Sequence, residues 1–175
     1  MHKHLAFLCI LFVTAVPALA QKDKSQRPSP PAKAQCKLSD GSTITVDYSS
    51  PRAKGRKVFG DLVPYGEVWR TGANEATTFV TTTDLKAGSL TIPAGNYTIF
   101  TIPNQDKWTL IVNKKTGEWG IPYKYESDEL GRTDMKASKT SMPVENFTIA
   151  FQQQGGACTM NISWESTQAS VQFSK

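Results

Sequence analysis

Two glutamates, Glu67 and Glu75, lie in a stretch of the chain rich in glycine and aromatic residues, and they could form a catalytic pair. Paired carboxylates act as acid and base, or as acid and nucleophile, in glycoside hydrolysis. Asp61 lies in the same stretch. We therefore name Glu67 and Glu75 as the candidate catalytic residues of a carboxylate-dependent, glycosidase-like hydrolase.

The same stretch also carries side chains suited to ligand binding. The planar guanidinium of an arginine fits a carboxylate or a phosphate group, and exposed tryptophans offer flat platforms for rings. A second aromatic-rich segment follows at residues 117–123. If the two segments meet, they line one ligand-binding pocket. Its predicted residues are Trp69, Arg70, Asn74, Glu75, Trp119 and Tyr123.

A purely structural role is the alternative for these residues. Arg70 could pair with Glu67 or Glu75 only to hold an irregular segment in place. Trp69 and Trp119 could likewise be buried as a small core beneath that segment. The sequence leaves both alternatives open.

Residues 1–20 have the pattern of a cleavable export signal. Lys3 supplies a basic start, and residues 5–16 form a run of twelve residues that is apolar apart from Thr14. A membrane-spanning helix needs about 20 apolar residues, so this run is too short to span. We predict cleavage before Gln21, and a periplasmic or secreted protein that does not span the membrane once the signal is removed.

Cleavage would restrict the chemistry of the mature chain. His2 and His4 are the only histidines of the sequence, and both lie in the signal. Without imidazole, neither a Ser-His-Asp nor a Cys-His arrangement can form. A His/Cys zinc site is excluded as well if the remaining cysteines pair, and the glycine motifs that bind phosphates and dinucleotides are absent. We expect no metal and no cofactor.

Two cysteines, Cys36 and Cys158, remain after the signal is removed. In an oxidising compartment they predict one disulfide, with two buried free thiols as the alternative. A bridge over so long a loop stabilises the fold by about 4 to 5 kcal/mol in the chain-entropy model.

Residues 21–35 are rich in proline and basic residues and hold hardly any large apolar side chain. This composition predicts a disordered linker. Residues 36–175 carry 15 basic and 14 acidic residues, a net charge of +1, and suit a single domain. Because nucleic-acid binding needs a clustered basic face, we expect no nucleic acid as partner.

Apolar and polar residues alternate along much of residues 36–175, a pattern typical of β-strands. In residues 42–48, for example, Ile44, Val46 and Tyr48 fall on one face. The other predicted strands are residues 77–82, 96–102, 108–113, 147–152, 158–164 and 169–173. The fold class is therefore all-β: an antiparallel β-sandwich or jelly roll of about 7 to 9 strands, with a closed barrel as the alternative.

One long segment, residues 49–76, lacks clean alternation. A loop of this length in a compact domain is either functional or a sign that an element has been overlooked. Because the segment holds Phe59 and Trp69, we expect it to pack on a sheet. Trp108 and Trp164 fall in phase with the apolar residues of their strands and are predicted to lie in the core.

The strings YSSPR (48–52), KGRKVFG (54–60) and LVPYGEVWRTGANEAT (62–77) closely resemble a bacterial family called domain of unknown function 2911. The resemblance continues through residues 92–103 and 108–111 and covers roughly residues 36–173. It implies exported bacterial proteins with a β-sandwich fold and no established activity. It supplies no catalytic residues.

Three hypotheses remain for the function. The first is a non-catalytic exported module that binds a small molecule, a glycan or an envelope partner through residues 49–76. The second is a hydrolase that uses Glu67 and Glu75, and the third is a purely structural envelope protein. Two carboxylates about 5 to 10 Å apart across an open cleft would favour the hydrolase. Exposed Trp69 and Trp119 without such a pair would favour binding.

Overall fold

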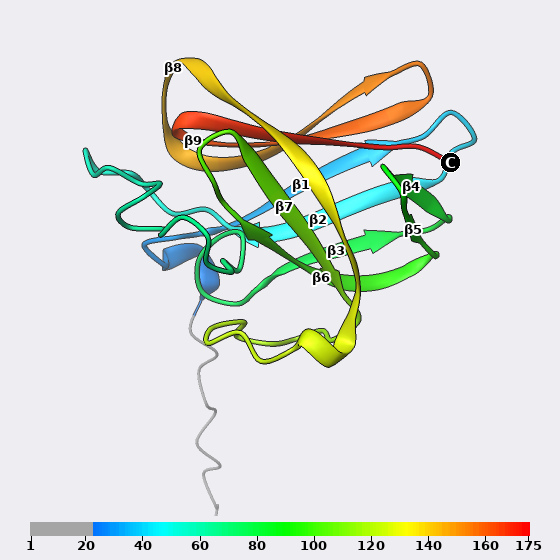
Figure 1. Cartoon of the computed structure of the whole chain (residues 1–175), viewed down its shortest axis with the longest axis horizontal. Helices are drawn as coiled ribbons and strands as arrows, with labels where there is room; N and C mark the ends of the chain where they lie inside the picture. Colours follow the sequence, from blue (N-terminus) through cyan, green and yellow to red (C-terminus); the bar gives the residue numbers. More distant parts are fainter. Residues whose placement is uncertain (1–22) are drawn as a thin grey trace, which may run out of the picture.

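The computed structural model describes residues 23–175, in which nearly all regular structure is β (Figure 1). The predicted signal at residues 1–20 lies outside the described residues. The strands are β1 (Pro31–Lys37), β2 (Thr43–Ser49), β3 (Thr77–Thr81), β4 (Leu85–Ala87), β5 (Leu90–Ile92), β6 (Gly95–Ile102), β7 (Lys107–Asn113), β8 (Glu129–Gln154) and β9 (Ala157–Phe173). Two single-turn 3-10 helices, η1 (Lys24–Gln26) and η2 (Glu126–Asp128), complete the fold.

Seven strands form one antiparallel sheet in the order β1-β2-β3-β6-β7-β8-β9, and β4 and β5 form a separate hairpin. The sheet curls until it is nearly closed, with β8 and β9 lying across β1 and β2 (Figure 1). The all-β antiparallel class predicted from the sequence is thereby confirmed. Both layers around the core come from one continuous sheet.

The core follows the alternation of the sequence. Ile44, Val46 and Tyr48 of β2 are buried, as the period-two pattern predicts. Trp108 and Trp164 are also buried, which confirms their predicted place in the core. No helix within residues 23–175 is long and apolar enough to cross a membrane.

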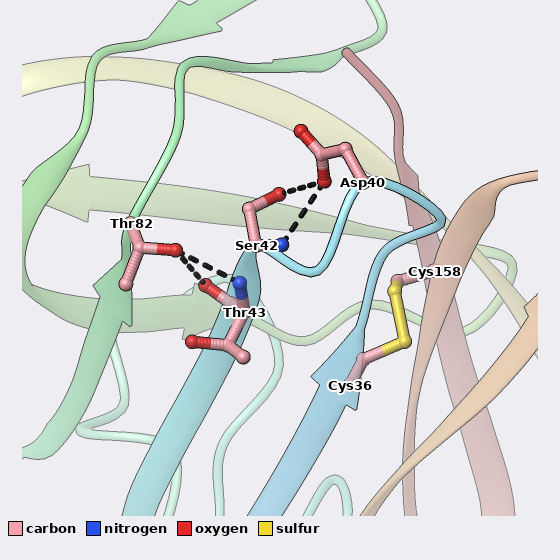
Figure 2. The surroundings of a disulfide bond; sticks show 6 residues. All are labelled: Cys36, Asp40, Ser42, Thr43, Thr82 and Cys158. Carbon is pink, nitrogen blue, oxygen red and sulfur yellow. Dashed lines mark hydrogen bonds between the residues drawn. A yellow bond between two sulfur atoms is a disulfide. The ribbon is translucent and has the colours of Figure 1, made fainter.

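The predicted disulfide is confirmed. Cys36, near the end of β1, is bonded to Cys158, near the start of β9, with the two Cα atoms 6.3 Å apart (Figure 2). The bond joins residues 122 positions apart in the sequence, so it links two sides of the curled sheet.

The ordered domain begins earlier than the sequence predicts. The linker is expected to extend to Gln35, whereas β1 begins at Pro31 and pairs with β2 along its whole length. The inward positions of β1 hold only small residues, Ala34 and Cys36 among them, so the apolar signal of this strand is weak. Proline is tolerated at the first residue of an edge strand, where no ladder hydrogen bond needs its missing N–H.

The long segment 49–76 packs on the sheet, as predicted. The ring of Phe59 lies 4.7 Å from that of Trp108 and 6.2 Å from that of Trp164, both centroid to centroid. Val58, Phe59 and Val63 are buried with them. The aromatic residues of the segment therefore extend the core, and this fixes the backbone between them without a regular strand.

Candidate functional site

A groove of about 410 Å³ lies along the long segment, which is a size typical of small-molecule pockets. The segment supplies most of its walls, and three further residues come from elsewhere in the chain: Ser29, Ile121 and Trp164. The residues contributed by the segment are Pro51, Arg56, Leu62, Val63, Pro64, Glu67, Val68, Trp69, Arg70, Gly72 and Ala73. These fourteen residues are called the groove below.

Trp69 belongs both to the core and to the groove. Its backbone pairs with Thr101 of β6, with N···O distances of 2.8 and 2.9 Å, and its ring stacks on Trp164 with centroids 6.0 Å apart. The indole Nε1 donates a hydrogen bond to the carbonyl oxygen of Gly72 at 3.1 Å. The sequence left two alternatives for Trp69, an exposed platform for a ligand or a buried core residue. The ring is both, because it packs on the core and is partly exposed to the groove.

Arg70 lies over the ring of Trp119, with the guanidinium carbon 5.1 Å from the ring centroid. Trp119 itself is 55% exposed. Desolvation lowers the pKa of Arg70, and the charge of Glu75 opposes this shift, but an arginine remains protonated throughout. Among residues 23–175, Arg70 forms no salt bridge, since Glu75 pairs with two other cations. The result is a cation held by an aromatic face at the edge of the groove.

The two aromatic segments that the sequence singled out meet in the fold. The amide of Ala76 donates to the carbonyl oxygen of Glu118 at 3.1 Å. Gly120 has a φ of +91°, and a Cβ atom there would lie 2.8 Å from the Cβ of Ala76 and 3.2 Å from that of Arg70. Only glycine allows so close an approach with this backbone conformation. The contact sets Trp119 against Arg70.

Tyr123 serves the scaffold of this second segment. Its ring packs on Phe100 with centroids 4.8 Å apart, and its hydroxyl donates to Glu129 at 2.6 Å. The fully buried Asn113 donates to the carbonyl oxygen of Tyr125 at 2.7 Å and to the Tyr123 hydroxyl at 3.2 Å. Burial and the Glu129 carboxylate raise the pKa of Tyr123. Tyr123 is not among the groove residues.

Asn74 and Glu75 contact the N-terminal segment of the described chain. The Asn74 amide donates to the carbonyl oxygen of Ser29 at 3.0 Å. Glu75 forms ion pairs with Arg27 at 2.7 Å and with Lys24 at 3.2 Å. The hydrogen bond from Arg27, then one from the backbone of Glu75 itself, and then Lys24 lower the pKa of Glu75 to about 2. Both predicted site residues therefore hold a strap, residues 23–30, beside the groove, and the strap adds Ser29 to its wall.

The two candidate catalytic glutamates do not share the groove. Glu67 lines the groove. Glu75 does not, and its carboxylate is paired with Lys24 and Arg27 of the strap. Asp61 pairs with Lys57 at 3.4 Å on the exposed side of the segment. The groove is thus lined by a single carboxylate. Residues 23–175 also contain no group of three or more His, Cys, Asp or Glu side chains that could hold a metal.

Several groove residues escape prediction from the sequence. Arg56 adds a second cation, and Leu62 and Ile121 are exposed apolar side chains on opposite segments. The exposure of Leu62 is seen in the structure and not in the sequence, and exposed apolar side chains that cluster mark sites of interaction. Nothing in the sequence reveals that Ser29 reaches the groove.

Comparison with curated proteins and with solved structures found no match. Residues 29–173 match a family described as Protein of unknown function (DUF2911). The matched range begins two residues before β1 and ends at the last residue of β9, so it contains every strand, the long segment and all fourteen groove residues. The chain therefore belongs to this family of proteins of unknown function, as the resemblance of its central strings implies.

Proposed function

We propose that the protein is an exported, non-catalytic binding module that holds a small ligand in the groove. The ligand has an apolar or flat body and one anionic group. One observation carries the proposal: Arg70, which forms no salt bridge among residues 23–175, is held on an exposed tryptophan at the edge of a groove with mostly apolar walls.

Different side chains of the groove bind different parts of the ligand. Leu62, Val63 and the edge of Trp69 bury the body of the ligand, since apolar area removed from water is the main source of affinity in such sites. Arg70, aided by Arg56, binds the anionic group through its fork of N–H donors. Glu67 accepts a hydrogen bond from a hydroxyl or amine of the ligand.

Binding is favoured over hydrolysis by the place of the carboxylates. A glycosidase needs two carboxyl groups that face the same bond, and the groove offers only Glu67. Export supports the same view, because cleavage of the predicted signal removes both histidines and so the most common general base. The exported location itself is part of the proposal.

A thermal-shift screen with small aromatic and aliphatic carboxylates and phosphates tests the proposal. A ligand of the groove should raise the melting temperature of the wild type and lose most of that effect in Arg70→Ala and in Trp119→Ala. Met142→Ala is the matched control, because Met142 is an exposed apolar side chain outside the groove. If every stabilising compound acts equally on all four proteins, the groove is not the binding site.

A further inference from the structure

A second cavity, of about 730 Å³, lies where β8 and β9 separate. The ladder between these strands ends at the pair Lys136–Ser170. Beyond this pair β8 stays bonded to β7, whereas the chain after β9 is bridged to β4 by Lys86 and Ser174. The cavity, called the polar cavity below, occupies the gap between the diverging strands and shares no lining residue with the groove.

The β4–β5 hairpin fixes one side of the polar cavity and lies beside the C-terminus (Figure 1). It packs very closely on β8 at two glycines. A Cβ atom at Gly131 would lie 2.6 Å from Leu90 Cδ1, and one at Gly88 would lie 2.9 Å from Thr133 Oγ1. Since neither position has room for a side chain, the hairpin is held against the sheet and the cavity has a defined wall.

The charges of the polar cavity are not balanced. Two of its four charged residues already have partners outside it: Arg132 binds Glu129 through two hydrogen bonds of 2.8 Å, and Asp134 pairs with Lys107 at 3.2 Å. Lys86 and Lys136 form no salt bridge within the described part of the chain. Lys86 on β4 and Lys136 on β8 therefore give the cavity a positive potential, because its one carboxylate, Asp134, is already paired with Lys107.

The register of the sheet places a lysine outside the cavity, Lys107, opposite Lys136. Lys107 and Lys136 are direct cross-strand partners in the β7–β8 ladder. Like charges placed opposite each other on neighbouring strands are destabilising. Asp134 already offsets the charge of Lys107, and an anion bound beside Lys136 would do the same for the second lysine.

The remaining lining of the polar cavity consists mostly of hydroxyl groups. Five of its residues are serine or threonine: Ser89, Thr109, Thr133, Ser170 and Ser174. Only the Ser170 hydroxyl donates to a protein group within residues 23–175, the carbonyl oxygen of Lys136 at 3.5 Å. The others are free to bind a ligand with several hydroxyl groups, since each can donate and accept. Val171 is the one large apolar residue among those that line the cavity.

We propose that the polar cavity binds a phosphorylated or sulfated sugar, a function independent of the groove. Lys86 and Lys136 hold the tetrahedral anion as point charges, and the serine and threonine hydroxyls bind the hydroxyl groups of the sugar. The cavity is much larger than a single phosphate or sulfate ion, so it fits the sugar as well as the anion.

Titration calorimetry at low salt tests this proposal with four probes: glucose 6-phosphate, glucose 6-sulfate, glucose and inorganic phosphate. At least one of the two sugar esters should bind the wild type more tightly than either glucose or phosphate alone. The double variant Lys86→Gln/Lys136→Gln should weaken that binding by roughly tenfold or more, as expected for lost hydrogen bonds to charged groups. Added salt should weaken it too.

The matched control is Lys37→Gln/Lys124→Gln, which removes two exposed positive charges outside the cavity. It should bind the sugar esters like the wild type, and so should Arg70→Ala, because Arg70 lies in the groove. Failure of both esters to bind, or equal losses in the two double variants, would overturn the proposal. Equal affinity for inorganic phosphate and the phosphate ester would overturn the role of the hydroxyl groups. Failure of the groove proposal would leave each of these results unchanged.

Discussion

The hydroxyl of Tyr48 in β2 meets both backbone polar groups of Ile149 in β8: it accepts a hydrogen bond from the amide nitrogen at 3.1 Å and donates to the carbonyl oxygen at 3.4 Å. Ser50, two residues further along the chain, adds a second link: its hydroxyl donates to the carbonyl oxygen of Phe147 at 2.7 Å. With the disulfide between Cys36 and Cys158, these side chains join the two margins of the sheet where no strand ladder does so within residues 23–175.

Removal of the Tyr48 hydroxyl should therefore loosen this closure. In Tyr48→Phe the amide of Ile149 stays buried without a partner, which costs about 1 to 3 kcal/mol. We expect the free energy of unfolding in urea to fall by that amount. The control is Tyr65→Phe, because the Tyr65 ring is exposed and its hydroxyl forms no hydrogen bond within residues 23–175. Equal stability of wild type and Tyr48→Phe would contradict the bridging role.

The disulfide should contribute more than any single hydrogen bond of the closure. Replacement of both cysteines, Cys36→Ser/Cys158→Ser, is expected to lower the free energy of unfolding by about 2 to 5 kcal/mol, since the reduced unfolded chain gains conformational freedom over a loop of 122 residues. A wild-type chain that begins at Gln21, and so lacks Cys9 of the predicted signal, should show no free thiol on labelling under denaturing, non-reducing conditions. The reductant that destabilises the wild type should leave the double variant unchanged.

The strap makes stability depend on pH through Glu75. Arg27, a hydrogen bond from the backbone of Glu75 itself, and Lys24 lower the pKa of Glu75 from its ordinary 4.5 to about 2 in the folded protein. The stabilisation is therefore complete above pH 4.5 and is lost as the pH falls toward 2. Because the Glu75 side chain is 41% exposed, solvent screening limits the effect to less than about 1 kcal/mol.

Urea denaturation between pH 2 and 7 checks this dependence. Glu75→Gln should be less stable than the wild type at pH 7 and should approach it at pH 2. Glu126→Gln is the control for the loss of one carboxylate, because Glu126 forms no salt bridge in the described chain and lies outside the strap. A constant difference between Glu75→Gln and the wild type at every pH would rule out the ion pairs as its cause.

The sequence predicts those parts of the fold in which apolar residues alternate strongly. The strand around Ile44, Val46 and Tyr48 is one such part, and the disulfide follows from simple counting. The first half of β8 does not appear in the sequence pattern, because its inward positions hold Thr133 and the small Ala137 beside Met135. The residues predicted as two strands after Cys158 form the single strand β9, which continues through Glu165 at a positive φ of 53°.

The candidate site, like the fold, could be predicted from the sequence only in part. The meeting of the segments around Arg70 and Trp119 could be predicted, since both are aromatic-rich and irregular. The partners of Glu75 could not, because Arg27 lies 48 residues away in a stretch whose composition indicates disorder. The composition of a segment indicates the conformational entropy that is lost when the segment becomes ordered. It does not reveal a distant carboxylate, here Glu75, whose ion pairs offset that loss.

The close contact at Gly120 gives the last prediction. A methyl group at this position would lie 2.8 Å from the Cβ of Ala76 and 3.1 Å from Phe100 Cε1, so the segment that carries Trp119 must shift away from Arg70. We expect Gly120→Ala to lower the free energy of unfolding by about 1 to 3 kcal/mol through overpacking, and to weaken binding of a groove ligand as strongly as Trp119→Ala does.

Gly117→Ala separates the effect of the close contact at Gly120 from the effect of a side chain at a positive φ. Gly117 has a similar φ of +78°, but a Cβ atom there would meet nothing within 4 Å. Its replacement adds backbone strain of about 1 kcal/mol without moving Trp119. Ligand affinity measured by calorimetry should therefore fall in Gly120→Ala and stay unchanged in Gly117→Ala. If both variants lose affinity alike, flexibility of the segment sets the affinity, and the contact between Gly120 and Ala76 does not position Trp119 for binding.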